Sequence, residues 1–239
     1  MDDPALDAGE HAAALRGLRR VHAISGTSGR MWRPIQRLLT TCRLSELSVM
    51  DVGCGDGSML RQLWQLARRS GCKLHLHGCD FSQRALDMCT AACEQAGIPV
   101  SLYHVDVLRQ PLPGPVDVVI NSLFLHHFDN DQIVPLLRQM ATRTRRLLLV
   151  EDLLRGRLSY TLVWLGVRLL TRCRVVHVDG PLSVKAAFTQ QEMRRLLNQA
   201  ELKTASLGKH WPERMFITWE IPDKQTAKEN NIGCAHHGR

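Results

Sequence analysis

The chain has 239 residues, a hydrophobic fraction of 44% and a formal net charge of +8 at pH 7. This length suits one sizeable domain and is too short to demand two, and the hydrophobic fraction is that of an ordinary globular protein. The positive charge would suit nucleic acid, but the arginines are scattered and only five Phe and two Tyr are present to stack on bases. We therefore interpret the charge mainly as a solvated surface and do not expect nucleic acid as the partner.

The eight cysteines form no CxxC pair, and no secretory signal is visible. We expect reduced thiols and a cytoplasmic protein. No stretch reaches the roughly 18 consecutive apolar residues that a membrane-spanning helix needs. Cys234, His236 and His237 have the side chains of metal ligands, but they lie in a polar terminus where incidental binding is the better interpretation. We propose no metal site.

An N-terminal helical segment, residues 1–43, is predicted to precede the main domain. Residues 1–8 are polar and expected to be disordered, and Leu15, Leu18 and Val21 have the spacing of a helix over residues 10–21. A glycine- and serine-rich break at residues 24–29 is followed by a second predicted helix over residues 31–39. The break could be the hinge of a lid that closes over a bound cofactor, or a plain turn between helices, and the sequence leaves both open.

Strands and helices alternate from residue 44 onward. Apolar runs predict strands over residues 47–52, 73–79, 100–105, 116–120 and 146–150. Helices are predicted after Gly57 with Ser58 as the cap, over residues 82–96 with Ser82 as the cap, and over residues 131–142. This alternation predicts an α/β fold: a parallel sheet with helices on both faces.

The last third departs from strict alternation. Residues 160–170 are apolar nearly all round, which predicts either a buried helix or part of an insertion, about residues 153–188, that covers the substrate. Thr189 and Glu192 have the spacing of a capping box at the start of the next helix. Residues 202–208 and 214–221 predict an antiparallel hairpin at the sheet edge, and residues 222–239 a loose polar tail.

The stretch LSVMDVGCGDGSML, residues 47–60, joins a buried strand to a helix through a glycine turn. Asp51 precedes Gly53, Gly55 and Gly57, and a turn of this kind lets backbone approach a nucleotide-like ligand closely. The dinucleotide fingerprint GxGxxG needs a third glycine for packing of helix against strand, and Ser58 stands at that place. The pattern acid-x-GxGxG therefore favours a cofactor without a pyrophosphate over NAD.

This pattern resembles the first motif of the class I methyltransferases that depend on S-adenosylmethionine (SAM), in particular those acting on small molecules. The resemblance covers about residues 44–221. It implies a Rossmann-like, seven-stranded, mostly parallel sheet with helices on both faces and a C-terminal antiparallel hairpin. It also implies SAM as the cofactor.

The resemblance implies roles for residues at the carboxyl ends of the strands, where ligands bind in open α/β sheets. Asp80 would accept hydrogen bonds from both ribose hydroxyls, or merely cap the helix at Ser82. Asp106 would receive the adenine amino group, or be ordinary turn chemistry. Val107 could supply a backbone N–H to the adenine, and the Phe81 ring could pack on the adenine or belong to the core. The expected cofactor-binding residues are Asp51, Gly53, Cys54, Gly55, Gly57, Asp80, Phe81, Asp106, Val107 and Asn121.

After the fourth strand the chain reads NSLFLHHF, residues 121–128. Many small-molecule methyltransferases have a similar leucine–histidine–histidine stretch beside the methyl group that is transferred. Imidazole has a near-neutral pKa suited to removing a proton from a hydroxyl. His127 is the first candidate for the base or the residue that orients the substrate, and His126 the second. Alternatively, both only shape the pocket wall.

Further polar residues lie beyond the fifth strand. Glu151 and Asp152 could face the substrate, but we favour a capping role for them. Arg174, His177 and Asp179 could contact the methyl acceptor, and loop geometry explains Asp179-Gly180-Pro181 equally well.

These features predict a SAM-dependent methyltransferase with a small, hydrophobic, phenolic, quinone-like or polyketide-like acceptor. The histidine pair slightly favours O-methylation over C-methylation. An RNA or protein methyltransferase is one alternative. Enzymes that methylate amino groups have Asp or Asn, two prolines and an aromatic residue after the fourth strand. This chain has NSLF there, which counts against that alternative. A non-catalytic domain that binds SAM or a partner is another, although its sign would be a damaged cofactor motif and this one is intact. The sequence does not indicate the oligomeric state.

Overall fold

The computed structural model describes residues 26–171 and 173–221. Its centre is a seven-stranded sheet with the strand order β3-β2-β1-β4-β5-β7-β6. The five strands β1 to β5 run parallel, and β7 pairs antiparallel with both β5 and β6. The strands are β1 (Glu46–Val52), β2 (Lys73–Asp80), β3 (Val100–His104), β4 (Val116–Ser122), β5 (Thr144–Leu153), β6 (Ser206–His210) and β7 (Arg214–Glu220). The predicted Rossmann-like sheet with its C-terminal antiparallel hairpin is confirmed.

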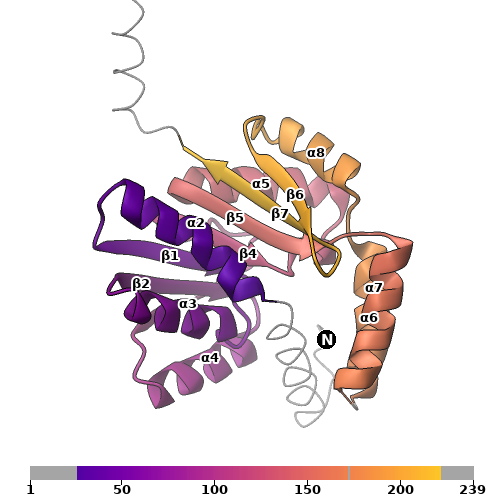
Figure 1. The fold of residues 1–239 in the computed structure, drawn as a ribbon, viewed down its shortest axis with the longest axis horizontal. Coiled ribbons are helices and arrows are strands. Elements are labelled where there is room, and N and C mark those ends of the chain that lie inside the picture. Colours follow the sequence, from indigo (N-terminus) through magenta and orange to yellow (C-terminus); the bar gives the residue numbers. More distant parts are fainter. Residues whose placement is uncertain (1–25, 172, 222–239) are drawn as a thin grey trace, which may run out of the picture.

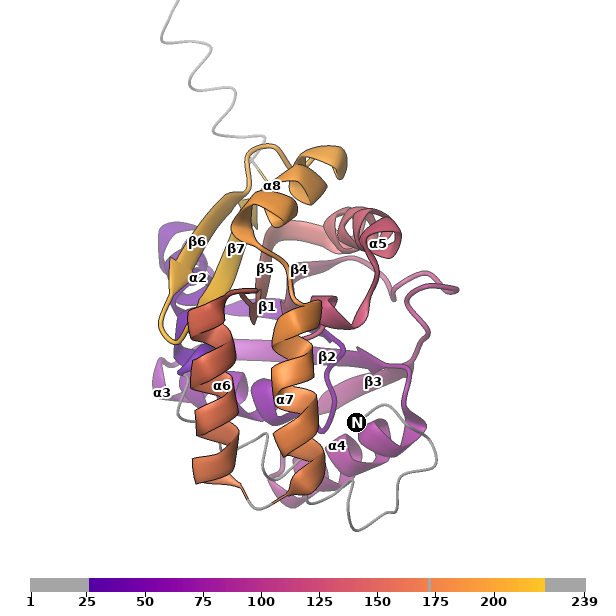
Figure 2. The same ribbon diagram turned by 90° about the vertical axis from the view of Figure 1, so that its right-hand side faces the viewer.

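Helices cover both faces of this sheet (Figure 1). Helices α2, α3 and α4 pack on one face, and α5 and α8 pack on the other. A pair of helices, α6 and α7, stands apart at one end of the sheet (Figure 2). The helices are α2 (Thr27–Thr41), α3 (Ser58–Arg69), α4 (Gln83–Gln95), the 3₁₀ turn η1 (Leu125–His127), α5 (Asn130–Arg143), α6 (Arg157–Leu170), α7 (Arg174–Ala186) and α8 (Gln190–Gln199).

Strand β1 explains why the two cores form. Side chains alternate between the faces of a strand, so Leu47 and Val49 join the core under α2 and α3, whereas Met50 and Val52 join the core under α5. A strand buried on both faces reads as a continuous apolar run, which is why the sequence identified it. Its carboxyl end leads directly into the glycine turn.

Two predicted boundaries are wrong at the start of helices. The helix expected to begin at residue 31 begins at Thr27, because Gly26 with φ of 65° occupies the N-cap position and lets the chain turn there. Ser58 does not cap α3. Gly57 is the N-cap residue, and the Asp56 carboxylate accepts the hydrogen bond of the Ser58 amide at 3.1 Å.

The fifth strand is longer than predicted, which changes the environment of two acids. It extends to Leu153, so Glu151 and Asp152 lie inside β5 and are fully buried instead of capping the next segment. The antiparallel partner β7, which pairs with β5 as far as Leu153, provides the hydrogen bonds that prolong it. The capping interpretation of both acids is therefore wrong.

Helices α6 and α7 form a hairpin where the sequence predicted partly loop. Asp179-Gly180-Pro181 lies inside α7, because Gly180 lets the two helices approach closely: a Cβ there would lie 3.0 Å from Val167 and 3.2 Å from Val163. The apolar run of α6 is not buried all round, since Leu158, Leu165 and Leu169 are exposed.

Some predictions fall outside the described residues. These are the disordered start, the helix over residues 10–21, the tail after residue 221 and the three possible metal ligands in that tail. None of the helices within residues 26–171 and 173–221 is long and apolar enough to span a membrane.

The predicted capping box of α8 can be tested by a single substitution. The Thr189 hydroxyl accepts a hydrogen bond from the Glu192 amide at 3.2 Å, and the Glu192 carboxylate accepts one from the Thr189 amide at 2.8 Å. Thr189→Ala should lower the free energy of unfolding by about 1 kcal/mol, and thus Tm by about 2–4 °C. Thr161→Ala is the control, because its hydroxyl bonds only within α6. An equal loss in both variants would contradict the cap.

Candidate active site

The glycine turn after β1 adopts a conformation that only glycine takes readily. Gly53, Gly55 and Gly57 have φ of 73°, 53° and 68°. A Cβ on Gly53 would lie 2.4 Å from the Phe124 ring, and one on Gly57 would lie 2.2 Å from the Cys89 sulfur. Gly55 differs, because no heavy atom among the described residues lies within 4 Å of the position of its Cβ. The turn is thus packed on protein at both ends and open in the middle.

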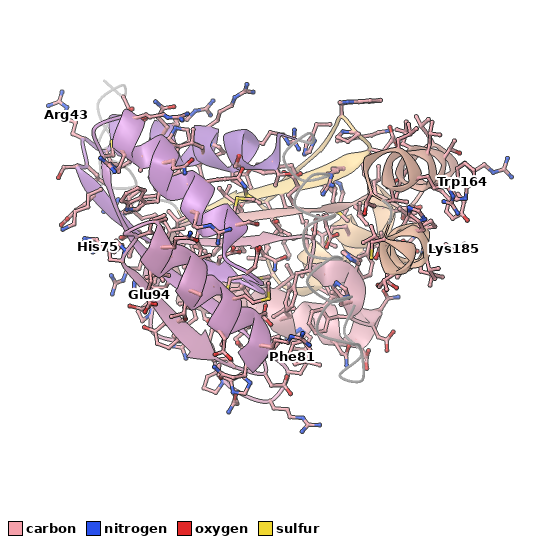
Figure 3. All side chains as sticks on the ribbon, turned by 90° about the horizontal axis from the view of Figure 1, so that it is seen from below. Arg43, His75, Phe81, Glu94, Trp164 and Lys185 are labelled. Carbon is pink, nitrogen blue, oxygen red and sulfur yellow. The ribbon has the colours of Figure 1, made fainter. Side chains whose placement is uncertain are left out.

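Asp80 holds the open part of this turn. One carboxylate oxygen accepts the hydrogen bond of the Gly55 amide and the other accepts that of Ser82, both at 2.9 Å. The same side chain therefore orients the glycine turn and supports the start of α4. Phe81 beside it is 56% exposed, an unusual exposure for a phenylalanine next to a buried strand. Figure 3 shows Phe81 at the end of α4 that faces the α6–α7 hairpin.

Asp51 and Asn121 bring two unpartnered oxygens to the same edge of the sheet. Asn121 donates to the Val52 carbonyl oxygen at 2.7 Å, but its own side-chain oxygen is buried and accepts no hydrogen bond among the described residues. One oxygen of Asp51 is in the same condition. Burial raises the pKa of the Asp51 carboxyl well above its usual range, and the neighbouring Cys89 and Asp80 raise it further.

Asp106 lies at the outer end of the site. It follows β3, accepts the hydrogen bond of the Leu108 amide at 3.0 Å and pairs with Arg109 at 3.4 Å. Val107 is buried, and its carbonyl oxygen accepts from Gln139 at 3.3 Å. These contacts agree with turn chemistry and leave the expected adenine contacts as a prediction.

The chemistry of these groups fits SAM. Open glycine backbone suits close approach of a ligand, and unpartnered buried oxygens suit its cationic amino and sulfonium groups. A carboxylate at the end of the second strand suits ribose hydroxyls, and an exposed phenyl ring suits the flat face of a purine.

His126 and Asp152 form a buried pair beyond β4. The Nδ1 of His126 lies 2.6 Å from the Asp152 carboxylate, which also accepts the His126 amide at 3.2 Å and the Leu153 amide at 2.6 Å. Burial alone would raise the pKa of Asp152, but the charge and hydrogen bonds of His126 and the two amides outweigh it and lower the pKa. Asp152 is thus an ionised, oriented partner for the imidazole.

The turn that presents this pair is strained. Leu123, at the junction of β4 and η1, has φ of 54°, a conformation that costs a leucine about 1–3 kcal/mol. Its amide donates to the Glu151 carbonyl oxygen at 2.8 Å, which fixes the turn against β5. His127 lies in the same turn with its ring centroid 4.3 Å from that of His126, but unlike His126 it is exposed.

Glu151, next to Asp152, joins residues that the sequence did not reveal. It accepts from Thr27 at 2.8 Å and from Arg30 at 2.9 Å, and it pairs with Arg214 at 3.9 Å. Thr27 and Arg30 lie in the first turns of α2, and Arg214 is the first residue of β7. The sequence gives one sign that Arg214 is unusual: it is a charged residue at the start of a largely apolar strand.

Three residues of the α6–α7 hairpin, Arg174, His177 and Asp179, are expected as possible contacts of the methyl acceptor. His177 makes a hydrogen bond of 2.8 Å with the Thr171 carbonyl oxygen, inside the hairpin itself. Arg174 and Asp179 belong to α7. The C-terminal part of this helix, at Val184, packs beside Leu153 and Leu123 at the carboxyl ends of β5 and β4. Their contact with an acceptor stays a prediction.

Comparison with known proteins supports what the geometry indicates. Residues 49–146 match the family model described as a methyltransferase domain. This part of the chain is similar to methyltransferase domains. The predicted resemblance to class I SAM-dependent methyltransferases is confirmed. A search of curated proteins finds no match.

Several solved structures resemble this chain over more than residues 49–146. Magnesium protoporphyrin IX methyltransferase from Synechocystis PCC 6803 with bound SAH is 16% identical, with a TM-score of 0.55 over 82% of this chain and 83% of that one. Human N-acetylserotonin methyltransferase in complex with SAM is 20% identical, with a TM-score of 0.57 over 88% and 56%. An O-methyltransferase family 2 protein from Planctomyces limnophilus DSM 3776, in complex with apigenin, is 22% identical, with a TM-score of 0.54 over 73% and 51%. The chain thus spans about half the length of this last protein, and at these identities the likeness shows the fold.

The open space at Gly55 leads to a test of the cofactor site. A methyl group there meets no protein atom within 4 Å, so Gly55→Ala should lower the affinity for S-adenosylhomocysteine (SAH). We expect a loss of about tenfold or more in calorimetry, since a methyl group would take the space of the ligand. Gly71→Ala is the matched control, because Gly71 also has a positive φ of 70° and open space but lies after α3. If both variants bind SAH like the parent, the turn does not hold the cofactor.

The raised pKa of Asp51 leads to a prediction on pH. Since the carboxyl holds its proton more strongly in the free protein, and the cationic amino group of SAH favours the ionised form, binding should release a proton. The affinity for SAH should therefore rise with pH, by at most about tenfold per pH unit, until Asp51 is ionised in the free protein too. Calorimetry in buffers of different ionisation enthalpy measures the proton release. Asp51→Asn should abolish it, and an unchanged release in that variant would assign it to another group.

Proposed function

We propose that this protein transfers the methyl group of SAM to a hydroxyl oxygen of a small, largely apolar acceptor. The observation that carries the proposal is the buried His126–Asp152 pair, which joins η1 to the carboxyl end of β5. An imidazole held at Nδ1 by a buried carboxylate has its Nε2 available to take a proton.

The methyl group of bound SAM is electrophilic because it is attached to a sulfonium. The residues of this chain then have three tasks. The glycine turn, Asp51 and Asp80 hold and orient the cofactor. Asp152 fixes the ring of His126 and stabilises its protonated form, and His126 accepts the proton of the acceptor hydroxyl as the oxygen attacks in line. His127 is the second candidate for that base and is the more accessible of the two.

The surroundings of the pair favour an apolar acceptor. Leu153, Val184 and Ala187 form a small buried cluster at this end of the sheet, and Leu123, Tyr160 and Val163 pack against it. The similar protein from Planctomyces limnophilus was solved with apigenin, and another similar structure is a mitomycin 7-O-methyltransferase. Both support a small organic acceptor and O-methylation over an RNA or protein substrate.

The experiment is methyl transfer from SAM to a panel of hydroxylated aromatic compounds, followed by substitution of the two histidines. His126→Ala should lower kcat by about 10²–10⁴-fold, because a general base contributes that much, with the affinity for SAH unchanged. Asp152→Asn should also lower kcat, since it removes the charge that stabilises the imidazolium while it keeps the shape of the side chain. His127→Ala is the matched control in the same turn.

The outcomes separate the candidates. A large loss of kcat in His127→Ala alone would make His127 the base. Full activity in both His126→Ala and His127→Ala would mean that the two histidines have only a structural role. Transfer to RNA or protein but to no compound of the panel would reject the small acceptor.

A further inference from the structure

A second group of charges lies on the opposite face of the sheet from His126. Because neighbouring residues of a strand point to opposite faces, Asp152 faces η1 while Glu151 faces α2. Glu151 is fully buried, and its carboxylate accepts from the Thr27 hydroxyl and from the Arg30 guanidinium at 2.8 and 2.9 Å. These two contacts satisfy Glu151 from the first turns of α2.

Arg214 completes this group but is not satisfied by it. The residue is 3% exposed, and its Nε and Nη1 are buried without a hydrogen-bond partner in the part of the chain that the structure describes. The nearest acid oxygen, on Glu151, lies 3.9 Å from Nε, which is too long for a hydrogen bond. A buried guanidinium that donates no hydrogen bond is costly unless something else accepts from it.

His210 adds a second unpartnered group at the same end of the hairpin. Its Nδ1 lies 3.2 Å from the Trp211 carbonyl oxygen, so this nitrogen carries the proton. Its Nε2 is buried and has no partner among the described residues. Burial lowers the pKa of His210 more than the Trp211 carbonyl and Glu151 raise it, which favours the neutral ring. A nearby anion would favour the protonated ring, in which Nε2 also donates.

Arg214 makes no hydrogen bond with the acids near it in the described part of the chain. Arg30 donates to the Glu151 carboxylate at 2.9 Å, whereas the Nε of Arg214 lies 3.9 Å from the same carboxylate, and Asp152 is bonded to His126. The buried Nε and Nη1 of Arg214 are thus left without an acceptor among the described residues. A planar guanidinium fork with unpartnered N–H groups matches the two oxygens of a carboxylate better than any other common anionic group except phosphate.

We propose that Arg214, supported by Arg30 and His210, binds a carboxylate of the ligands that occupy this methyltransferase. The carboxylate comes from the acceptor or from the methionine part of the cofactor, and both present the same chemistry to Arg214. The proposal rests on the proposed function, since it adds a charged group to an otherwise apolar acceptor that reaches the same end of β5.

The first experiment uses benzoate as the probe and neutral benzamide as its comparison, each at equal ionic strength and in the presence of SAH. A ligand that binds only the folded state raises Tm. Benzoate at tenfold its dissociation constant should raise Tm by about 3–5 °C, and benzamide should not. Arg214→Met should lose the benzoate shift. Arg143→Met should keep it, because Arg143 also has a buried, unpartnered Nε but lies at the far end of α5.

The second experiment identifies the source of the carboxylate. Calorimetry compares SAH with 5′-methylthioadenosine, which lacks the amino acid part. If the cofactor provides the carboxylate, Arg214→Met should weaken SAH about tenfold or more and leave 5′-methylthioadenosine unchanged. If the acceptor provides it, SAH binds equally to both proteins and only the benzoate shift is lost. Failure of the parent protein to bind SAH would reject the proposed function, while the benzoate shift, repeated without SAH, would still test Arg214.

Arg214→Lys guards against a variant that does not fold, since it keeps the positive charge but loses the fork. We expect it to fold and to lose most of the benzoate shift. The proposal is overturned if the parent shows no difference between benzoate and benzamide and Arg214→Lys binds SAH like the parent. It is also overturned if benzoate stabilises the parent and Arg214→Lys equally while SAH affinity is unchanged.

Discussion

The carboxyl end of β5 depends on two neighbouring carboxylates that are both fully buried. Glu151 and Asp152 end β5, and the alternation of the strand sends one to each face. A buried carboxylate needs a charged or hydrogen-bonding partner, so each acid fixes a different element. Asp152 holds η1 through His126, and Glu151 holds the start of α2 and the start of β7. Three segments far apart in the chain thus meet around one strand end.

The cofactor side depends on backbone geometry instead. Its turn is set by three glycines with positive φ, and its open middle is held by the Asp80 carboxylate through the Gly55 amide. These constraints act over short stretches of chain that follow parallel strands. The two halves meet at β4, where Asn121 bonds back to β1 and the strained Leu123 starts the turn that carries His126.

This difference explains how much the sequence could predict. The sheet, the glycine turn and the acids at the strand ends follow from local patterns, and the family match supports the methyltransferase resemblance inferred from them. The role of Glu151 could not be predicted, because Thr27 lies 124 residues away and Arg214 belongs to another strand. Helix α7 was missed because its glycine and proline look like a turn until α6 packs against them.

Stability alone gives no reason for the charges at the end of β5. Replacing a buried ion pair by apolar side chains of similar volume is often neutral or stabilising, by about 1–4 kcal/mol. The desolvation of Glu151, Asp152 and Arg214 is therefore a cost that the fold does not require. A strand end that only had to pack would be served by leucine and valine, as residues 147–150 of β5 are. The two proposals give these charges a role in binding: a proton at His126 on one face, and an anionic oxygen at Arg214 on the other.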